Sequence, residues 1–139
     1  MPRHASLRSS MKVLGAAALV ATTALAQSDG PSLEKLEKYR RDALLAGGFA
    51  PLVLGGEADR QVSLVKGSGQ PLLFLHGVGN QGSSWFEVAP AFAGRYRAVV
   101  PDLPGHGESA PASGDLPMAT IVGGAERLLL EVTSERKAI

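Results

Sequence analysis

Two glycine-rich segments hold residue types whose spacing could do chemistry. Residues 76–82 read HGVGNQG and residues 102–109 read DLPGHGES, and each segment follows a short apolar run. Glycines allow a backbone N–H to approach a substrate closely, without side chains in the way. An N–H aimed at a carbonyl oxygen under attack stabilises the developing negative charge by about 3–4 kcal/mol. The first segment could therefore supply an oxyanion-binding amide.

The same glycines also fit a second chemistry. Gly77, Gly79 and Gly82 match G-x-G-x-x-G, and Asp102 lies at the end of the next apolar run. This pattern is typical of dinucleotide-binding loops, in which an acid binds the ribose. Two features speak against it, because His76 stands where a small residue is expected and Asp102 leads into a loop rich in Pro and Gly. Dinucleotide binding is kept as an alternative.

A third possibility lies within the second segment alone. Ser109, His106 and Asp102 are the residue types of a nucleophile, a base and an acid. Three residues on one short Pro/Gly loop, however, lack the rigid frame that a working triad requires. We expect Asp102 and Ser109 instead to brace the loop through side-chain hydrogen bonds to turn amides.

The elements that must position these segments follow from the spacing of apolar residues. Apolar positions three, four and seven apart predict helices, and short apolar runs between turn residues predict buried strands. The expected helices cover residues 32–46, 83 or 84 to 93, and 118–132, and the expected strands cover 51–54, 61–65, 72–75 and 97–100, with another opening at 137–139. Alternating strands and helices predict an α/β fold, a mostly parallel sheet with helices on both faces.

This order of strand, His-Gly loop, helix, strand and D-x-x-G-x-G-x-S loop closely resembles the α/β-hydrolase family, over about residues 58–139. The resemblance implies an oxyanion hole in which the backbone N–H of Val78, between Gly77 and Gly79, is a donor. It also implies that His76 braces this loop rather than acting as a base.

Three further residues are expected near the substrate pocket. They are Asn80 in the first segment, and Ser84 and Trp85 at the start of the helix that follows.

The resemblance also indicates what to look for beyond these loops. In the family, a nucleophile elbow G-x-S-x-G comes after the next strand, followed by the acid and the histidine. No G-x-S-x-G occurs in the 139 residues, so none of the triad is expected here. We therefore expect the N-terminal portion of an incomplete, truncated hydrolase domain that is inactive alone. The parent is expected to act on a small ester-like substrate, without cofactor or metal.

The nature of the parent's nucleophile stays open. A serine enzyme is favoured weakly, because relatives with an aspartate nucleophile often carry Pro at the position of Gly79. An aspartate enzyme of the epoxide hydrolase or dehalogenase type is the alternative. A truncated, non-catalytic product is a third.

The N-terminal residues resemble a targeting signal. Basic residues up to Lys12 precede an apolar run over 13–20, and Ala24-Leu25-Ala26 stands before Gln27. These are the three parts of a secretory signal peptide, and the run is too short to span a bilayer. We expect export after cleavage near Ala26-Gln27, no stable membrane insertion, and three parts: a signal peptide (1–26), a helical lead-in (27–50) and the hydrolase domain (51–139).

Composition narrows the choice of partners. The chain has 14 Lys and Arg against 13 Asp and Glu, and no long basic run that would follow a nucleic-acid backbone. Nucleic acid is therefore an unexpected partner. Cysteine is absent, which excludes disulfides, zinc-thiolate sites and a cysteine nucleophile. Nothing in the sequence indicates the oligomeric state.

Overall fold

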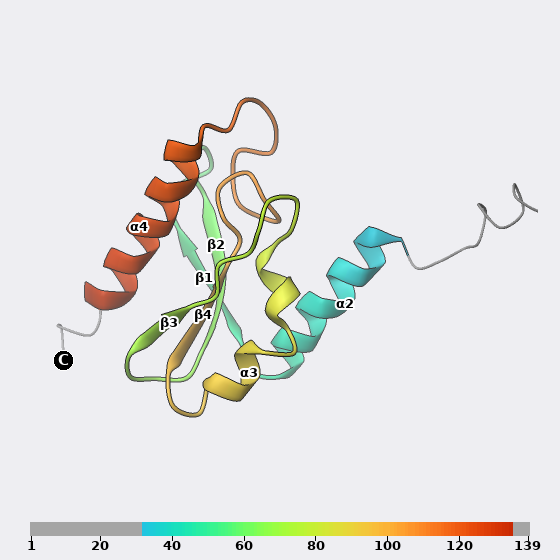
Figure 1. Ribbon diagram of the computed structural model, residues 1–139, viewed down its shortest axis with the longest axis vertical. Coiled ribbons are helices and arrows are strands. Elements are labelled where there is room, and N and C mark those ends of the chain that lie inside the picture. The colour runs from blue at the N-terminus through green and yellow to red at the C-terminus, as the bar shows by residue number, and fades with distance from the viewer. Residues whose placement is uncertain (1–31, 135–139) are drawn as a thin grey trace, which may run out of the picture. The chain divides into compact units, whose positions relative to one another are not determined.

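The structure is a computed structural model that describes residues 32–134. The predicted signal peptide and the predicted strand opening at 137–139 lie outside these residues. The described elements are α2 (Leu33–Ala46), β1 (Ala50–Leu54), β2 (Gln61–Lys66), β3 (Pro71–Leu73), the 3-10 helix η1 (Gly82–Trp85), α3 (Ala89–Phe92), β4 (Arg97–Pro101) and α4 (Met118–Ser134). Figure 1 shows them in order along the chain.

The strands form one mixed sheet in the order β1-β2-β4-β3. β1 pairs with β2 and β2 pairs with β4, both antiparallel, while β3 and β4 are parallel. The expectation of a mostly parallel sheet is therefore wrong for the described strands. The connections explain the difference: a short turn joins β1 to β2 as a hairpin, whereas η1 and α3 form the crossover that a parallel pair such as β3 and β4 requires.

Helices cover both faces of this sheet, as the sequence predicted. Along β4 the side chains alternate, because successive residues of a strand point to opposite faces. Ala98 and Val100 lie in one hydrophobic cluster with Leu44 of α2, and Val99 lies in a second cluster with Leu128 of α4. Figure 1 shows α4 on one side of the sheet and α2, η1 and α3 on the other.

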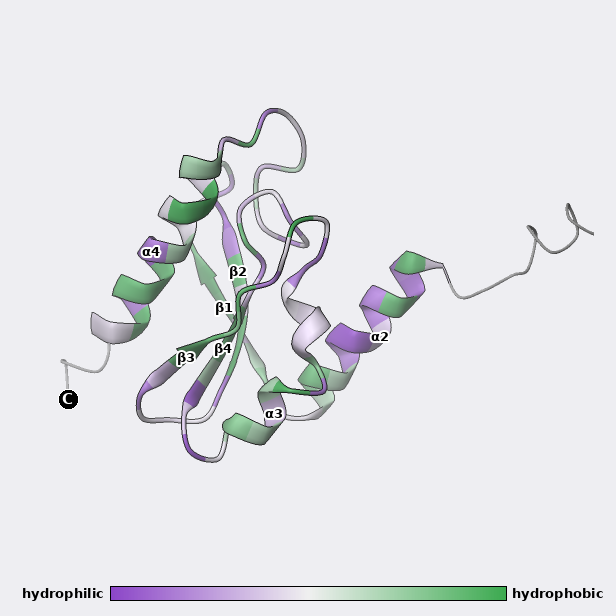
Figure 2. Ribbon diagram, in the orientation of Figure 1, coloured by the Kyte–Doolittle hydropathy of each residue, from purple (hydrophilic) through white to green (hydrophobic). Residues whose placement is uncertain are grey.

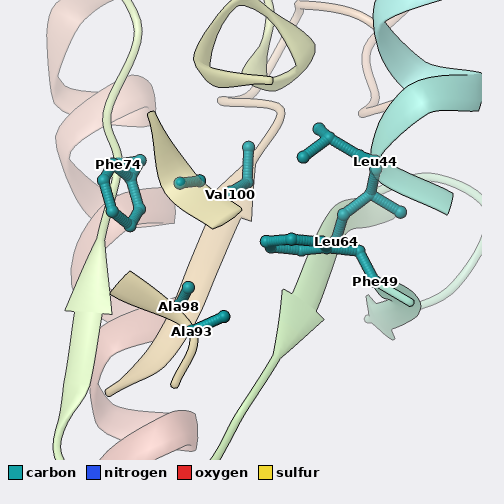
Figure 3. Packing of buried hydrophobic residues seen from close by; sticks show 8 residues of the cluster. Leu44, Phe49, Leu64, Phe74, Ala93, Ala98 and Val100 are labelled. Atoms are coloured by element: carbon teal, nitrogen blue, oxygen red, sulfur yellow. The ribbon is translucent and has the colours of Figure 1, made fainter. Parts of the chain in front are cut away.

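The larger cluster joins the helical lead-in to the hydrolase-like part. Figure 3 shows Leu44 and Phe49 packed beside Leu64, with Phe74 and Val100 across from them. Leu44 is completely buried. Figure 2 shows that α2 is otherwise largely hydrophilic, while the strands and much of α4 are hydrophobic. The end of α2 is therefore part of the domain core rather than a separate appendage.

Two elements near the first glycine segment differ from their predictions. β3 ends at Leu73 rather than at residue 75, although the Phe74 N–H still donates to the Val99 carbonyl at 2.9 Å. The single helix predicted up to residue 93 is divided into η1 and α3. Pro90 lies in the first turn of α3, and its ring nitrogen has no hydrogen to donate, so an α-helix continuing through it would lose a hydrogen bond and be kinked or broken there.

Within residues 32–134, none of the helices combines the length and the apolar character needed to cross a bilayer.

Candidate functional site

The first glycine segment leaves β3 through a tight turn. The Asn80 N–H donates to the Gly77 carbonyl at 3.2 Å, and Gly79 has φ +73°, a left-handed conformation that favours glycine. These are the features of a type II turn with Val78 and Gly79 at its centre. The Val78 side chain is 88% exposed, and its N–H meets no acceptor in the described part of the chain. The turn thus presents an unpaired backbone donor at the carboxyl end of a strand.

His76 connects this turn to the second glycine segment. Its Nε2 accepts a hydrogen bond from the Leu103 N–H at 3.0 Å, so the proton of the neutral ring lies on Nδ1, which donates to the Gly77 carbonyl at 2.9 Å. Burial, aided by the neighbouring His106, holds the pKa of His76 below its ordinary value, against the opposing effect of the Gly77 bond. The ring is therefore neutral near pH 7, with both nitrogens occupied.

Asp102 ties the same two segments together from the other side. Its Oδ1 accepts the Gly82 N–H at 2.8 Å and its Oδ2 accepts the Glu108 N–H at 2.9 Å. The residue is only 6% exposed. Because both carboxylate oxygens of Asp102 already accept hydrogen bonds, they are not available to bind the ribose of a dinucleotide. Gly82 also begins a short 3-10 helix, rather than the longer α-helix that follows a dinucleotide-binding loop. This geometry speaks against the dinucleotide alternative.

The Ser109 hydroxyl is also engaged in hydrogen bonds, and its partners are backbone groups rather than His106, the histidine of the same loop. Its Oγ donates to the Asp102 carbonyl at 2.6 Å and accepts the Val62 N–H at 2.9 Å. His106 directs Nδ1 to the Pro104 carbonyl, 3.0 Å away. Ser109, His106 and Asp102 therefore do not form a nucleophile–base–acid relay. Ser109 instead connects the end of β4 to β2.

The three residues predicted near a pocket lie in different surroundings. Asn80 accepts the Gln81 N–H with Oδ1 at 3.0 Å and lines an open groove of about 720 Å³. Ser84 is half-buried in η1. Trp85 packs toward the core, with its ring centroid 5.7 Å from that of Phe74. Of the three, only Asn80 is found on this groove.

The groove also includes residues that the sequence did not single out. α2 forms one wall of it, and Arg41 makes a 2.6 Å ion pair with Glu108 of the second glycine segment. The charges of α2 were apparent in the sequence, but no spacing rule connects positions 41 and 108. Only the packing of α2 on the core brings them together.

No group of histidine, aspartate and glutamate residues suited to a metal ion is found in the described region.

Comparison with known proteins assigns this arrangement to a family. Residues 72–137, which contain both glycine segments, match the family model described as "Alpha/beta hydrolase family". The predicted α/β-hydrolase family is confirmed. The α/β fold class is confirmed with it, in the form of a small mixed sheet covered by helices.

Relatives of this chain have different descriptions. An uncharacterised protein of Mycobacterium tuberculosis is 34% identical over 80 residues, which are 58% of this chain and 24% of that protein. A pimeloyl-[acyl-carrier protein] methyl ester esterase of Aeromonas hydrophila is 46% identical over 50 residues, 36% of this chain and 19% of the esterase. Each match thus spans about a quarter or less of the relative.

Among solved structures, a mutant of a candidate epoxide hydrolase from Pseudomonas aeruginosa is similar to the described fold. It has a TM-score of 0.54 and 35% identity, over 61% of this chain and 30% of the other. The hydrolase class is therefore shared by relatives with different substrates.

Proposed function

We propose that this chain supplies the oxyanion-binding part of a serine hydrolase acting on a small ester-like substrate. The observation that carries the proposal is the Val78 N–H, which lies unpaired in a turn at the carboxyl end of β3. Open α/β sheets bind their ligands at this end of the strands. The similarity of 50 residues of this chain to a methyl ester esterase supports an ester-type substrate.

The surrounding bonds suit this role. An oxyanion donor must be held in place before the reaction, because a donor that has to reorganise loses most of its advantage. His76 fixes the start of the turn through the Gly77 carbonyl, and Asp102 fixes its far side through the Gly82 N–H. We propose that His76, Asp102 and Ser109 brace the site and transfer no protons.

The activity requires a nucleophile in addition to this segment. The sequence contains no G-x-S-x-G, so we propose that these 139 residues are inactive without further residues supplying the triad. We also propose export after removal of residues 1–26.

The test replaces the N–H without changing the turn. Proline is common at the first central position of a type II turn, so Val78→Pro removes the donor while suiting the backbone. In the hydrolase that carries this segment and a nucleophile, we expect kcat to fall by about 10²–10³ while KM changes much less. Val78→Ala keeps the N–H and is the matched control, with kcat close to that of the unchanged enzyme. A Val78→Pro enzyme with normal circular dichroism and normal kcat would show that Val78 is not the donor.

An aspartate nucleophile is the second candidate, favoured by the similarity to the Pseudomonas aeruginosa structure. The two mechanisms leave different covalent intermediates, an acyl group on serine or an alkyl ester on aspartate. Mass spectrometry of enzyme quenched during turnover of an ester and of an epoxide distinguishes them. A modified aspartate would overturn the serine proposal.

A further inference from the structure

The open groove of about 720 Å³ lies between α2 and the two glycine segments. Gly79, Asn80 and Gln81, which line it, come directly after Val78 in the sequence. A substrate whose carbonyl oxygen binds the Val78 N–H therefore has this groove beside it. The volume is within the range of about 300–1,000 Å³ that small-molecule sites occupy. The side chains along the groove are thus placed to select the rest of the substrate.

The α2 wall of the groove is a charged face of the helix. Its lining residues follow the first at distances of three, four and seven positions, which places them on one side of α2: Glu34, Glu37, Lys38 and Arg41. In most surface helices this spacing carries the apolar stripe that packs on the core. Other residues hold α2 in place, because Leu44 is completely buried and the Tyr39 ring lies 5.9 Å from the Phe86 ring. The charged face is therefore available to a ligand.

Ion pairs within the structure leave two acids of this face without partners. Arg41 makes its 2.6 Å ion pair with Glu108, and Lys38 pairs at 2.5 Å with a carboxylate one turn further along α2. Within residues 32–134, neither Glu34 nor Glu37 has such a partner. Lys38 lies four positions from Glu34 and next to Glu37, so no part of the wall carries a large net charge. The wall thus offers carboxylate acceptors without being uniformly acidic.

The facing wall adds donors and acceptors without apolar side chains. The remaining lining residues are three glycines and four polar residues: Gly79, Gly105, Gly107, Asn80, Gln81, His106 and Glu108. Asn80 Oδ1 accepts the Gln81 N–H, so the Asn80 NH₂ group remains a donor. The Gly79 N–H has no acceptor among residues 32–134. His106 uses Nδ1 for a backbone carbonyl, which leaves Nε2 of the neutral ring as an acceptor.

We propose that this groove binds the non-reacting part of the ester, and that this part is neutral and carries hydroxyl groups, as in an ester of glycerol or of a sugar. Each hydroxyl both donates and accepts, so it can donate to Glu34 or Glu37 in a charge-assisted bond and accept from Asn80. An alkyl chain in the same place would displace water from these groups and return no hydrogen bond. That the ligand is the substrate rests on the proposed hydrolase function, whereas the preference of the groove for hydroxyl groups does not.

The test titrates the full chain with three acetate esters. Glyceryl monoacetate and propyl acetate share one carbon skeleton and differ in two hydroxyl groups, and acetylcholine carries a positive charge instead. Two-dimensional amide NMR follows the N–H groups of Gly79 and Gly105 and the side-chain NH₂ of Asn80. We expect saturable shifts with glyceryl monoacetate and a dissociation constant of about 1–10 mM, as for other ligands of this size. Propyl acetate and acetylcholine should bind at least about fivefold more weakly, because neither replaces the hydrogen bonds of the displaced water.

Variants identify the side chains responsible. The double change Glu34→Leu/Glu37→Leu removes both unpaired carboxylates and keeps good helix formers. It should weaken the binding of glyceryl monoacetate at least about fivefold and should not weaken that of propyl acetate. Glu126→Leu makes the same change on α4, outside the groove, and is the control that should bind like the unchanged chain.

Four results would overturn the proposal. They are equal affinity for glyceryl monoacetate and propyl acetate, tighter binding of acetylcholine, no effect of the double change, and no saturable shift up to about 100 mM, tenfold above the weakest expected constant. Tighter binding of acetylcholine would mean that the carboxylates select a cation. Because binding is measured without turnover, its outcome is separate from the Val78→Pro kinetics. A normal kcat in that variant would refute the oxyanion assignment and leave a measured preference for hydroxyl groups standing.

Discussion

Asp102→Asn is the most informative single change, because it alters two hydrogen bonds and almost no volume. Both carboxylate oxygens of Asp102 accept backbone N–H groups, one from Gly82 and one from Glu108. Asparagine has one oxygen, so it can keep one of these bonds. Its NH₂ group then faces the other N–H, donor against donor.

The size of the effect follows from the burial of the site. A hydrogen bond to a charged group contributes about 1.5–3 kcal/mol, and an unpaired buried donor adds to the loss. Water cannot easily replace the lost partner, because Gly107 lies so close that a Cβ there would be 2.3 Å from Asp102 Oδ2. We therefore expect Asp102→Asn to lower the free energy of unfolding by about 2–4 kcal/mol.

Urea unfolding followed by tryptophan fluorescence measures this quantity. Trp85 is the one tryptophan of the chain, is the last residue of η1 and packs against Phe74, so its emission reports on the affected region. Asp115→Asn, in the exposed loop before α4, removes the same charge and should change stability by no more than about 0.5 kcal/mol. If the two variants unfold alike, Asp102 does not hold the glycine segments together as argued.

Three further outcomes are expected. The pKa of His76 is lower in the folded chain than in the unfolded one. The stability that His76 contributes is therefore complete above about pH 6.5 and is lost as the pH falls through the lower folded value. His76→Gln should reduce this pH dependence, as measured by urea midpoints between about pH 4 and 8. Gly82→Ala would place a Cβ 2.6 Å from the Pro101 carbonyl oxygen and should cost about 1–3 kcal/mol in thermal unfolding, whereas Gly94→Ala, with nothing within 4 Å, should be nearly neutral. N-terminal sequencing of exported protein should begin at Gln27, and a soluble product that keeps residues 1–26 would contradict the predicted signal peptide.

The sequence predicted the regular elements well wherever apolar spacing alone determines them. The observed ranges of α2, β1, β2, β4 and α4 lie within one or two residues of the expected ones. Each of these elements buries a clear apolar stripe or run, such as Leu128 and Val132 of α4. The family was also identified correctly, because the two glycine segments and their order are specific in combination.

Strand direction and helix continuity were predicted less well. Short apolar runs indicate strands but do not say which neighbour a strand pairs with, and the antiparallel pairing of β2 with β4 joins residues far apart in the sequence. Pro90 indicated a break in the helix before α3. The apolar spacing over residues 85–92 nevertheless led to the prediction of a single helix.

The roles proposed for the site residues depend on atoms that spacing cannot place. A serine in a turn was expected to bond to nearby amides, yet Ser109 Oγ reaches the Val62 N–H, 47 positions away. The Arg41–Glu108 ion pair likewise arises from packing between distant segments. The identity of the oxyanion donor remains a prediction that kinetics must test.

The shared Asp102 carboxylate sets a rule for loop exchange in this domain. Because one side chain holds residues 76–82 and residues 102–109 at the same time, the two loops form a single transplantable unit. We expect an exchange of the first loop for that of another member of the family to disturb the fold less when the second loop is exchanged with it. Residues 112–115 are exposed and take no part in this bonding, so an insertion there should destabilise the fold least.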